Sequence, residues 1–395
     1  MTNRAPIDVL IVGAGMHVCG RGTGTCGTVL PAVVQAHRDG VVGRMRVAAT
    51  SADSMKHFQE KLDMLNRRLG TQAVFDGLPK HGTDPEAWRA AVNQVSSRGC
   101  VIIVVPDALH APIARAALER GLPVLVEKPL TPTLAEARML VALAREHNTY
   151  GAVDFHKRWD LMNLKLKEAV QARRLGVPLY ATVEYSQRRV IPEHVFRNWV
   201  EQANPFQYLC VHFVDILQFA LQATPRRAMA TGQKQLLAGQ GIDAFDAVQA
   251  IVEWSLPGSA APFVSSFAAN WIDPNATSAL SYQSLKVIGT LGRFESDQKD
   301  RGLRFITDEA GIEDVNPYFT QSYPAGTGQA YCGYGIDSVR TFLEDVRDMA
   351  DGLCTPADLA SCRPTLEQAL TSTAVVEAVN RSLAGRASWV SIESL

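Results

Sequence analysis

A lysine at the end of a short apolar run is the residue of this chain best placed to do chemistry. The run Leu122–Val126 is rich in branched side chains and stops at Glu127, Lys128 and Pro129. A buried parallel strand ends at the edge of an open α/β sheet, which is where such sheets bind ligands. An ammonium group at that edge can polarise a carbonyl oxygen or relay a proton. Lys128 is therefore the first candidate catalytic residue.

The segments around this lysine follow one another as strand, helix and strand. Residues 101–105 are apolar, and a helical period of apolar residues follows as far as Gly121. This order predicts a βαβ unit with a right-handed crossover. A capping-box spacing at Thr133–Glu136 then predicts a helix that runs to about His147.

The stretch from Val101 to Asn148 resembles the Gfo/Idh/MocA family of NAD(P)-dependent oxidoreductases. Its most specific marks are the Glu-Lys-Pro triplet at 127–129 and the segment from Pro106 to His110. Later segments match in order, at Val287–Thr290, at Gly292 and in a closing pattern between Phe342 and Val390. The resemblance implies an α/β fold: an N-terminal Rossmann domain with a doubly wound parallel sheet, then a C-terminal α+β domain with a large open, mostly antiparallel sheet.

The length agrees with two domains, since 395 residues exceed one average domain. We place a dinucleotide-binding Rossmann domain at residues 1–150 and a substrate-binding and oligomerisation domain at 151–395. The C-terminal helix is free in this scheme to pack back on the first domain. The resemblance implies NAD or NADP as cofactor, with contacts from Pro106, His110, Glu127 and Lys128.

Composition excludes several classes of partner. The formal net charge is −1 and the pI is about 6.8, so neither a nucleic acid nor a membrane surface is an expected partner. No apolar run reaches the roughly 18 residues that span a bilayer, and Asp8 interrupts the early hydrophobic stretch, which predicts a cytoplasmic protein. The seven scattered cysteines form no Cys-x-x-Cys pair, so we expect reduced thiols and no metal site.

The amino terminus carries a partial dinucleotide-binding fingerprint. A strand from Asp8 leads to Gly13 and Gly15, and with Met16 these are the expected contacts to a pyrophosphate. Val18 occupies the position of the usual third glycine.

A glycine-rich segment at 19–27 follows, which the family pattern lacks. One interpretation is an insertion that lengthens the phosphate-binding turn and makes Arg21 available to a phosphate oxygen. The alternative is a flexible loop that contacts nothing. We favour contact with cofactor or substrate, because glycines raise the entropy lost on folding.

The end of the second strand bears on the choice between NAD and NADP. NAD selection usually depends on a carboxylate there, and Ala49 to Ser51 contain none. Thr50 and Ser51 can instead bond a 2′-phosphate, with Lys56 supplying charge, which favours NADP slightly. The alternatives are that Asp53 reaches the ribose, or that Ser51 or Asp53 only caps the next helix.

The segment after Tyr150 enters the second domain and carries His156, Lys157 and Arg158. The resemblance implies that this strand brings polar residues to the substrate. Because neighbours in a strand point to opposite faces, His156 and Arg158 can share a side and bind substrate together. The alternative is a solvated basic cluster at a domain junction.

A second candidate catalytic segment opens a helix at Asn204. Tyr208, His212 and Asp215 are spaced to share one helical face. The family commonly has an aspartate where Tyr208 stands. We therefore expect His212 to be the acid/base, Lys128 the polariser of the carbonyl oxygen, and Tyr208 an orienting hydroxyl, with Asp215 toward the substrate. The alternative for His212 is a packed histidine capped by Asp215.

The second domain is expected to be rich in strands. Alternating or β-branched runs occur at 178–186, 228–232, 247–254, 262–270, 284–288 and 293–296. A sheet with helices on one face leaves its other face to be covered, which predicts a homodimer or homotetramer through this sheet. The segment from Ala310 to Gly335 lacks regular periodicity and is interpreted as a long arm or active-site loop.

Polar and aromatic residues of this domain suit a sugar-like substrate. They occur at Arg188, Arg189, His194, Arg197–Trp199, Asn270, Trp271, Asp273 and Asn275. Hydrogen-bonding groups backed by a flat ring fit a polyol, whose C–H face packs on the ring. The expected reaction is hydride transfer between the nicotinamide and a secondary alcohol or ketone of a sugar, inositol or related polyol. The alternatives are glycosidase or epimerase chemistry with transient hydride transfer, and a non-catalytic regulator that senses the cofactor.

Overall fold

The computed structural model describes residues 4–309, 311–326 and 328–392, which form two compact units. Unit 1 comprises the described residues within Met1–Thr131, Ala135–Trp159 and Tyr318–Ala369. Unit 2 comprises those within Pro132–Leu134, Asp160–Pro317 and Leu370–Leu395. Both units are discontinuous in sequence, whereas the sequence predicts a single boundary at residue 150.

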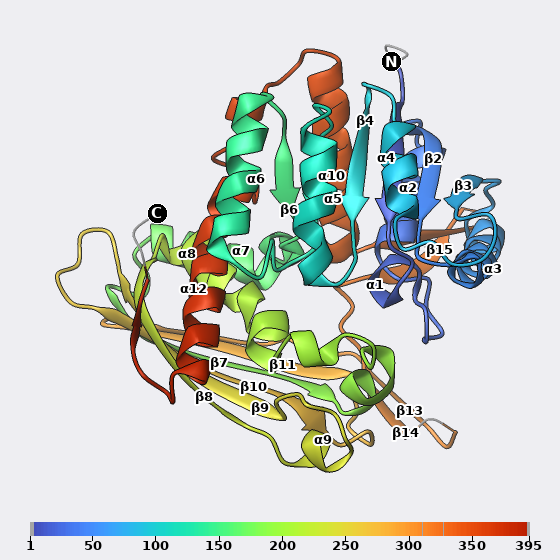
Figure 1. Cartoon of the computed structure of the whole chain (residues 1–395). Helices are drawn as coiled ribbons and strands as arrows, with labels where there is room; N and C mark the ends of the chain where they lie inside the picture. The colour runs from blue at the N-terminus through green and yellow to red at the C-terminus, as the bar shows by residue number, and fades with distance from the viewer. Residues whose placement is uncertain (1–3, 310, 327, 393–395) are drawn as a thin grey trace. The chain divides into compact units, whose positions relative to one another are not determined.

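Unit 1 is built on a parallel sheet with strand order β3-β2-β1-β4-β5-β6 (Figure 1). The strands are β1 (Ile7–Val12), β2 (Val42–Ala48), β3 (Phe75–Leu78), β4 (Gly99–Ile103), β5 (Val124–Val126) and β6 (Gly151–Val153). β4 and β5 are buried along their whole length, as expected for parallel strands covered on both faces. The predicted Rossmann sheet is confirmed.

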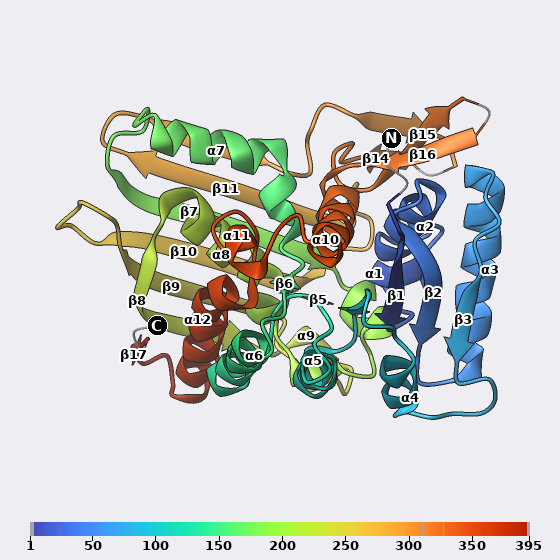
Figure 2. The ribbon, with the colours of Figure 1, turned by 90° about the horizontal axis from the view of Figure 1, so that it is seen from above.

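Helices cover both faces of this sheet. Those of unit 1 include α1 (Met16–Cys19), α2 (Val29–Arg38), α3 (Ala52–Leu69), α4 (Ala87–Asn93), α5 (His110–Leu118), most of α6 (Leu134–Glu146), α10 (Tyr334–Ala350) and α11 (Pro356–Leu359). In Figure 2, α2 and α10 lie side by side on one face, and α4 and α5 lie on the other. α10 thus packs on the sheet although it is far from α2 in sequence.

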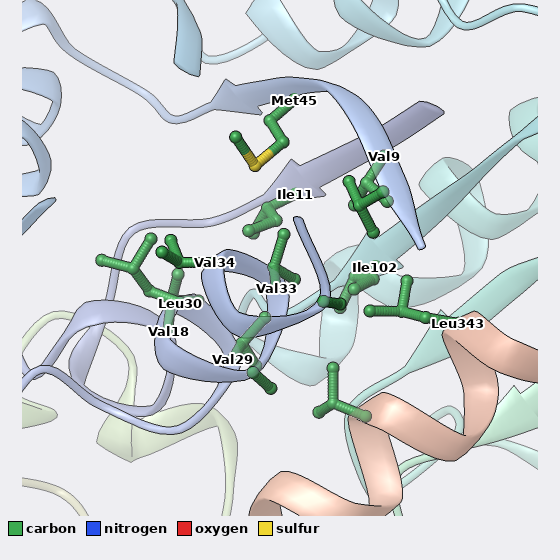
Figure 3. Close-up of a cluster of buried hydrophobic side chains, with 14 of the residues drawn as sticks. Val9, Ile11, Val18, Val29, Leu30, Val33, Val34, Met45, Ile102 and Leu343 are labelled. Carbon is green, nitrogen blue, oxygen red and sulfur yellow. The ribbon is translucent and has the colours of Figure 1, made fainter. Parts of the chain in front are cut away.

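A dry apolar core joins the sheet to these helices. Figure 3 shows Ile11 of β1, Ile102 of β4, Val33 of α2 and Leu343 of α10 among the converging side chains, and all four have no exposed surface. Burying a side chain of this size contributes about 1.5–3 kcal/mol. This packing fixes the carboxyl ends of the parallel strands relative to one another, and those ends carry the candidate residues.

Unit 2 is built on a mixed sheet with strand order β12-β11-β7-β10-β9-β8-β17. Its strands are β7 (Pro178–Arg188), β8 (Thr224–Gln233), β9 (Ala247–Ser255), β10 (Phe263–Asp273), β11 (Ser281–Gly289), β12 (Arg293–Asp297) and β17 (Val390–Ser391). Only β7 and β10 pair in parallel among these strands. The predicted mostly antiparallel sheet is confirmed, and each of the six predicted strands is present.

One face of the second sheet is covered within unit 2. The helices of this unit are α7 (Leu161–Gln171), α8 (Val211–Leu221), α9 (Leu236–Gly239) and most of α12 (Leu366–Ala384). Side chains along β9 alternate between buried and partly exposed, so the sheet has a core face and an outer face. A hollow of about 610 Å³ lies over β7, β8, β9, β10 and β11, and its lining includes Glu184, Gln249 and Lys286.

The segment predicted to be an irregular arm contains strands. β13 (Arg304–Thr307) pairs with β14 (Gly311–Asp314) in unit 2, and β15 (Gln321–Ala325) pairs with β16 (Gly328–Cys332) in unit 1. The prediction of irregular structure from Ala310 to Gly335 was therefore wrong for 311–314, 321–325 and 328–332, and Ala310 itself lies outside the described residues. Most side chains of these strands are exposed, so they leave no hydrophobic alternation to detect.

No described helix is long and apolar enough to cross a membrane.

The glycine-rich segment after α1 is a folded loop. The Thr28 backbone N–H donates to the His17 carbonyl at 2.8 Å, which closes the base of the loop. The Lys61 ammonium of α3 donates to the carbonyls of Thr23 at 2.6 Å and Thr25 at 2.8 Å. The alternative of a loop that contacts nothing is wrong, because these bonds attach the loop to α3.

One glycine of this loop is required by its backbone. Gly27 has a φ of +72°, and a Cβ there would lie 2.5 Å from the Val18 carbonyl oxygen. We predict that Gly27→Ala destabilises the protein by more than about 1 kcal/mol, seen as a lower melting temperature. Gly24→Ala is the matched control, because a Cβ at Gly24 meets nothing within 4 Å. Equal melting temperatures for the two variants would contradict this account of the loop.

Candidate functional site

The turn after β1 has the close backbone approach that a pyrophosphate requires. Gly13 has a φ of +118°, and a Cβ there would lie 2.0 Å from the Val104 carbonyl oxygen. Gly15 is exposed at the start of α1, and a Cβ there would meet nothing within 4 Å. Met16 is half-buried beside it. The turn therefore leaves open space in which backbone N–H groups can approach a phosphate, so it fits a dinucleotide.

The end of β2 presents hydroxyl groups. The Ser54 backbone N–H donates to the Ser51 hydroxyl at 3.1 Å, so Ser51 caps α3 as one of the alternatives proposed. Thr50 and Lys56 are exposed. The nearest carboxylate along the chain, Asp53, points to solvent with 69% of its side chain exposed.

Lys128 follows β5 and is buried, with 6% of its surface exposed. Its ammonium lies 3.6 Å from a carboxylate oxygen of Glu127. Burial lowers the pKa of Lys128, and the carboxylates of Glu127, Asp107 and Asp154 partly oppose that shift. The result is a lysine that gives up its proton more readily than an exposed one, as proton-transfer chemistry near neutral pH requires.

A cluster of half-buried His17 with buried Asp154 and His156 lies among the ends of β1, β5 and β6. His17 Nε2 lies 3.3 Å from an Asp154 oxygen and 3.4 Å from a Glu127 oxygen. His156 Nδ1 lies 3.8 Å from the same Asp154 oxygen, and the Ser338 hydroxyl donates to the other. The two imidazole rings stack with centroids 5.8 Å apart. Asp154 thus has hydrogen-bond partners in His17 and Ser338, and His156 lies slightly farther away.

Charges in this cluster are shifted in opposite directions. Burial alone would lower the pKa of His17, but the carboxylates of Glu127 and Asp154 outweigh it and raise that pKa. Burial would raise the pKa of Asp154, but hydrogen bonds and charge from His156 and His17 hold it below its usual range. Burial lowers the pKa of His156. The two carboxylates thus favour the protonated form of His17, and the two histidines favour the ionised form of Asp154.

His110 is fully buried and links two loops of the sheet edge. Its Nδ1 lies 2.9 Å from the Pro129 carbonyl, and its Nε2 lies 2.9 Å from the Val105 carbonyl. The ring therefore fixes the turn that carries Lys128 against the turn after β4. Contact of His110 or of half-buried Pro106 with a cofactor stays a prediction.

The His-Lys-Arg triplet departs from the prediction. β6 ends at Val153, because the Phe155 N–H bonds back to the Val153 carbonyl, and His156–Trp159 forms a 3₁₀ turn. The strand alternation that paired His156 with Arg158 therefore does not apply. All three side chains are buried, so the alternative of a solvated basic cluster is also wrong. Arg158 donates to the Gln368 side chain, and the Lys157 ammonium lies over the Tyr334 ring.

The second candidate catalytic segment lies in unit 2 and begins as a π-helical turn. Phe206–Cys210 forms this turn, which carries Tyr208, and α8 follows with His212 and Asp215 both buried. Two hydrogen bonds to Asn380 of α12 hold the start of this segment. Asn204 Nδ2 donates to Asn380 Oδ1 at 2.7 Å, and Asn380 Nδ2 donates to Gln207 Oε1 at 2.8 Å. The predicted helix is present, with its first turn wider than expected. Lys128 lies in unit 1 and His212 in unit 2, so their pairing stays a prediction.

Tyr208 sits in an aromatic group of unit 2. Its ring centroid lies 4.8 Å from that of Phe196, 5.6 Å from Trp199 and 6.1 Å from Trp271. Trp271 is fully buried, whereas Tyr208 and Trp199 are half-exposed. Several polar residues predicted to bind substrate are engaged elsewhere: Arg188 with Thr277, Arg197 with Glu201, and Asn275 with the Val190 backbone. The rings, more than these polar groups, form a platform.

Sequence reasoning missed the cluster around Asp154. One signal was available, since Asp154 directly follows a strand as Lys128 almost does. The ligand atoms of His17, Asp154 and His156 all lie within 4.8 Å of one another, a spacing that can also hold a metal ion. The hydrogen bonds to Asp154 account for the cluster without one, and the absence of a metal site stays a prediction.

Family models match both parts of the chain. Residues 7–155 match the oxidoreductase family with an NAD-binding Rossmann fold, and residues 163–295 match the GFO/IDH/MocA C-terminal domain. The chain belongs to the Gfo/Idh/MocA oxidoreductase family. The family membership that the Glu-Lys-Pro triplet indicates is thereby confirmed.

Curated relatives match this family member over different lengths. 1,5-Anhydro-D-fructose reductase from Ensifer adhaerens is 28% identical over 64% of this chain and 78% of its own length. Inositol 2-dehydrogenase from Streptomyces avermitilis is 32% identical over 36% of this chain and 37% of its own length. The uncharacterised oxidoreductase YdgJ from Escherichia coli is 34% identical over 38% of this chain. The matched region spans 43% of YdgJ, less than half of that relative.

Solved structures share the fold over nearly the full chain. Scyllo-inositol dehydrogenase from Lactobacillus casei, bound to NAD(H) and scyllo-inositol, has a TM-score of 0.66 and 16% identity, and covers 98% of this chain and 100% of its own. GenD2 from gentamicin A biosynthesis, in complex with NAD, has a TM-score of 0.68 and 20% identity, and covers 100% of this chain and 98% of its own. At these identities the likeness supports the fold.

The charge state of the cluster can be tested by replacing its central carboxylate. In Asp154→Asn one of the two carboxylates that stabilise the His17 imidazolium is gone, so the pKa of His17 should fall. Ring-proton NMR titration measures it, with exposed His81 as the unchanged internal reference. Asp76→Asn, at a half-exposed ion pair with Lys80, is the control variant. An unshifted His17 in Asp154→Asn would show that Asp154 does not set its charge.

Proposed function

We propose that this protein transfers a hydride between a bound NAD(P) and a secondary alcohol or ketone of a sugar, inositol or related polyol. The supporting observation is the buried Lys128 at the carboxyl end of β5, with a lowered pKa and three carboxylates acting on it. Gly13, Gly15 and the hydroxyls at the end of β2 are the groups that would hold the cofactor. A bound nicotinamide would supply the hydride acceptor or donor.

The roles of the chain's own residues follow from their chemistry. Lys128 in its ammonium form donates a hydrogen bond to the reacting oxygen and stabilises the negative charge that develops there. His212 takes or returns the hydroxyl proton, because an imidazole titrates near neutral pH. Tyr208 orients the substrate through its hydroxyl. The Glu127 carboxyl group beside Lys128 raises the pKa of that lysine and so favours its ammonium form.

The substrate class is supported by the aromatic group around Tyr208. A half-exposed Trp199 beside Tyr208 can pack against the C–H face of a ring bearing several hydroxyls. Two of the relatives are named 1,5-anhydro-D-fructose reductase and inositol 2-dehydrogenase, and both names indicate a substrate of this kind. As cofactor we propose NADP in preference to NAD, since β2 ends in hydroxyls without an inward carboxylate.

We also propose that a second copy of the chain covers the outer face of the unit 2 sheet. That face is partly exposed and hollowed, which suits a symmetric sheet-to-sheet contact in a dimer or tetramer. A cytoplasmic location is proposed as well, supported by seven cysteines that form no disulfide. Light scattering on the purified chain measures the assembly, and a monomer would contradict it.

Replacing the lysine tests the proposed chemistry. Lys128→Ala removes the group that stabilises charge on the reacting oxygen, so turnover should fall roughly tenfold or more while the dissociation constant for NADP changes little. Formation or loss of reduced nicotinamide is followed by absorbance over a panel of polyols, aldoses and inositols with both cofactors. Lys165→Ala, at a side chain 74% exposed on α7, is the control. Unchanged turnover in Lys128→Ala would remove the lysine from the mechanism.

The pH profile gives a second readout of the same lysine. If the ammonium form is required, ketone reduction should decline as pH rises through a pKa lower than that of an exposed lysine. Lys128→Arg keeps its charge at all these pH values, so whatever activity it retains should lack this alkaline decline. A wild-type rate that stays level up to the ordinary lysine pKa would contradict the lowered value.

A further inference from the structure

The arginine of the glycine-rich loop contacts the first turn of α3, the helix that follows β2. Arg21 Nη1 donates to the Ser54 hydroxyl at 2.9 Å, in the first turn of α3. Its Nη2 lies 3.9 Å from an Asp53 oxygen, too far for a hydrogen bond. The loop that carries Arg21 is held on α3 by Lys61, which bonds the carbonyls of Thr23 and Thr25. The guanidinium is therefore held in two ways: directly by Ser54, and through its loop, which Lys61 attaches to α3.

The position of this guanidinium matters because of what binds there in the fold. In Rossmann domains the adenosine ribose lies at the end of the second strand. A carboxylate there binds the 2′-hydroxyl of NAD, whereas in NADP-binding domains a nearby arginine binds the 2′-phosphate. β2 ends at Ala48, and no carboxylate follows it before Asp53. The Ser51 and Ser54 hydroxyls lie 3.0 Å apart at the same place.

The electrostatics of the place favour an anion on balance. Arg21 is 44% exposed, so its guanidinium is both fixed by Ser54 and open to a ligand. The opposing charge is Asp53, which points to solvent and also faces His57 at 3.7 Å. Lys56 is a further exposed cation on α3, and the Lys61 charge is directed at loop carbonyls. A phosphate approaching Ser51 would meet the N–H groups of Arg21 that do not bond Ser54, and the one hydroxyl hydrogen that the Ser51–Ser54 hydrogen bond does not use.

We propose that Arg21 binds the 2′-phosphate of NADP, so that the glycine-rich insertion sets cofactor preference. This inference rests on the proposed function and assigns to Arg21 the role that sequence reasoning gave to Lys56. Arg21 is here a specificity-determining residue: it contacts the part of the cofactor that distinguishes NADP from NAD. The insertion brings it to the ribose end from the β1 side of the fold.

Calorimetric titration of the purified full-length chain with NADP⁺ and NAD⁺ tests this role without turnover. Arg21→Ala should weaken NADP⁺ binding roughly tenfold or more, because a charge-assisted hydrogen bond to phosphate is lost, and should leave NAD⁺ binding nearly unchanged. Arg21→Lys, which retains a cation, should keep part of the preference. Lys56→Ala should shift the ratio of the two affinities much less, and Arg67→Ala, at an exposed arginine in the last turn of α3, is the matched control.

A second probe separates the phosphate from the rest of the cofactor. Adenosine 2′,5′-bisphosphate and ADP carry the adenosine ribose with and without the 2′-phosphate, and Arg21→Ala should weaken only the first. Equal weakening of both, or an effect confined to NAD⁺, would overturn the proposal and indicate that Arg21 orients Asp53 toward the ribose instead. Unaltered affinities in a variant that melts like wild type would overturn it too. If wild type bound neither dinucleotide, the proposed function itself would fail, and this inference with it.

Discussion

The burial of one ammonium group constrains the arrangement of unit 1. An unpaired charge in a protein interior costs several kcal/mol, so Lys128 can be buried only with compensating groups around it. Glu127 supplies one from the same turn, and Asp107 and Asp154 supply others from the turns after β4 and after β6. The parallel sheet makes this possible, because the carboxyl ends of neighbouring strands meet at one edge. The core shown in Figure 3 keeps those strand ends in register.

Further titratable residues, Asp154 and His17, lie at the same edge of the sheet. Asp154 faces Lys128 and also accepts from His17, which belongs to the turn after β1. The glycine turn that fits a pyrophosphate and the lysine proposed for catalysis are thereby joined through one carboxylate. A change in charge at either place is felt at the other, since buried groups interact at low dielectric.

Local patterns were enough to predict most elements and the place of Lys128 just after β5, but not the strands at 311–314, 321–325 and 328–332. β5 and its Glu-Lys-Pro ending are read from consecutive residues, and so are the alternating strands of unit 2. The cluster around Asp154 escaped because its members come from separate strand ends and meet only in the folded sheet. The triplet at His156 was misread because a backbone bond from Phe155 ends the strand early. The target of the glycine-rich loop depends on Lys61, which no local pattern links to that loop.

The most direct measurement is a crystal structure of the chain with NADP and an unreactive polyol or ketone. We expect Lys128 Nζ to lie within hydrogen-bond distance, about 2.7–3.2 Å, of the oxygen on the carbon nearest the nicotinamide. A side chain that keeps its contact with Glu127 and lies beyond reach of every substrate oxygen would contradict the account. In that case the buried charge would serve the fold alone.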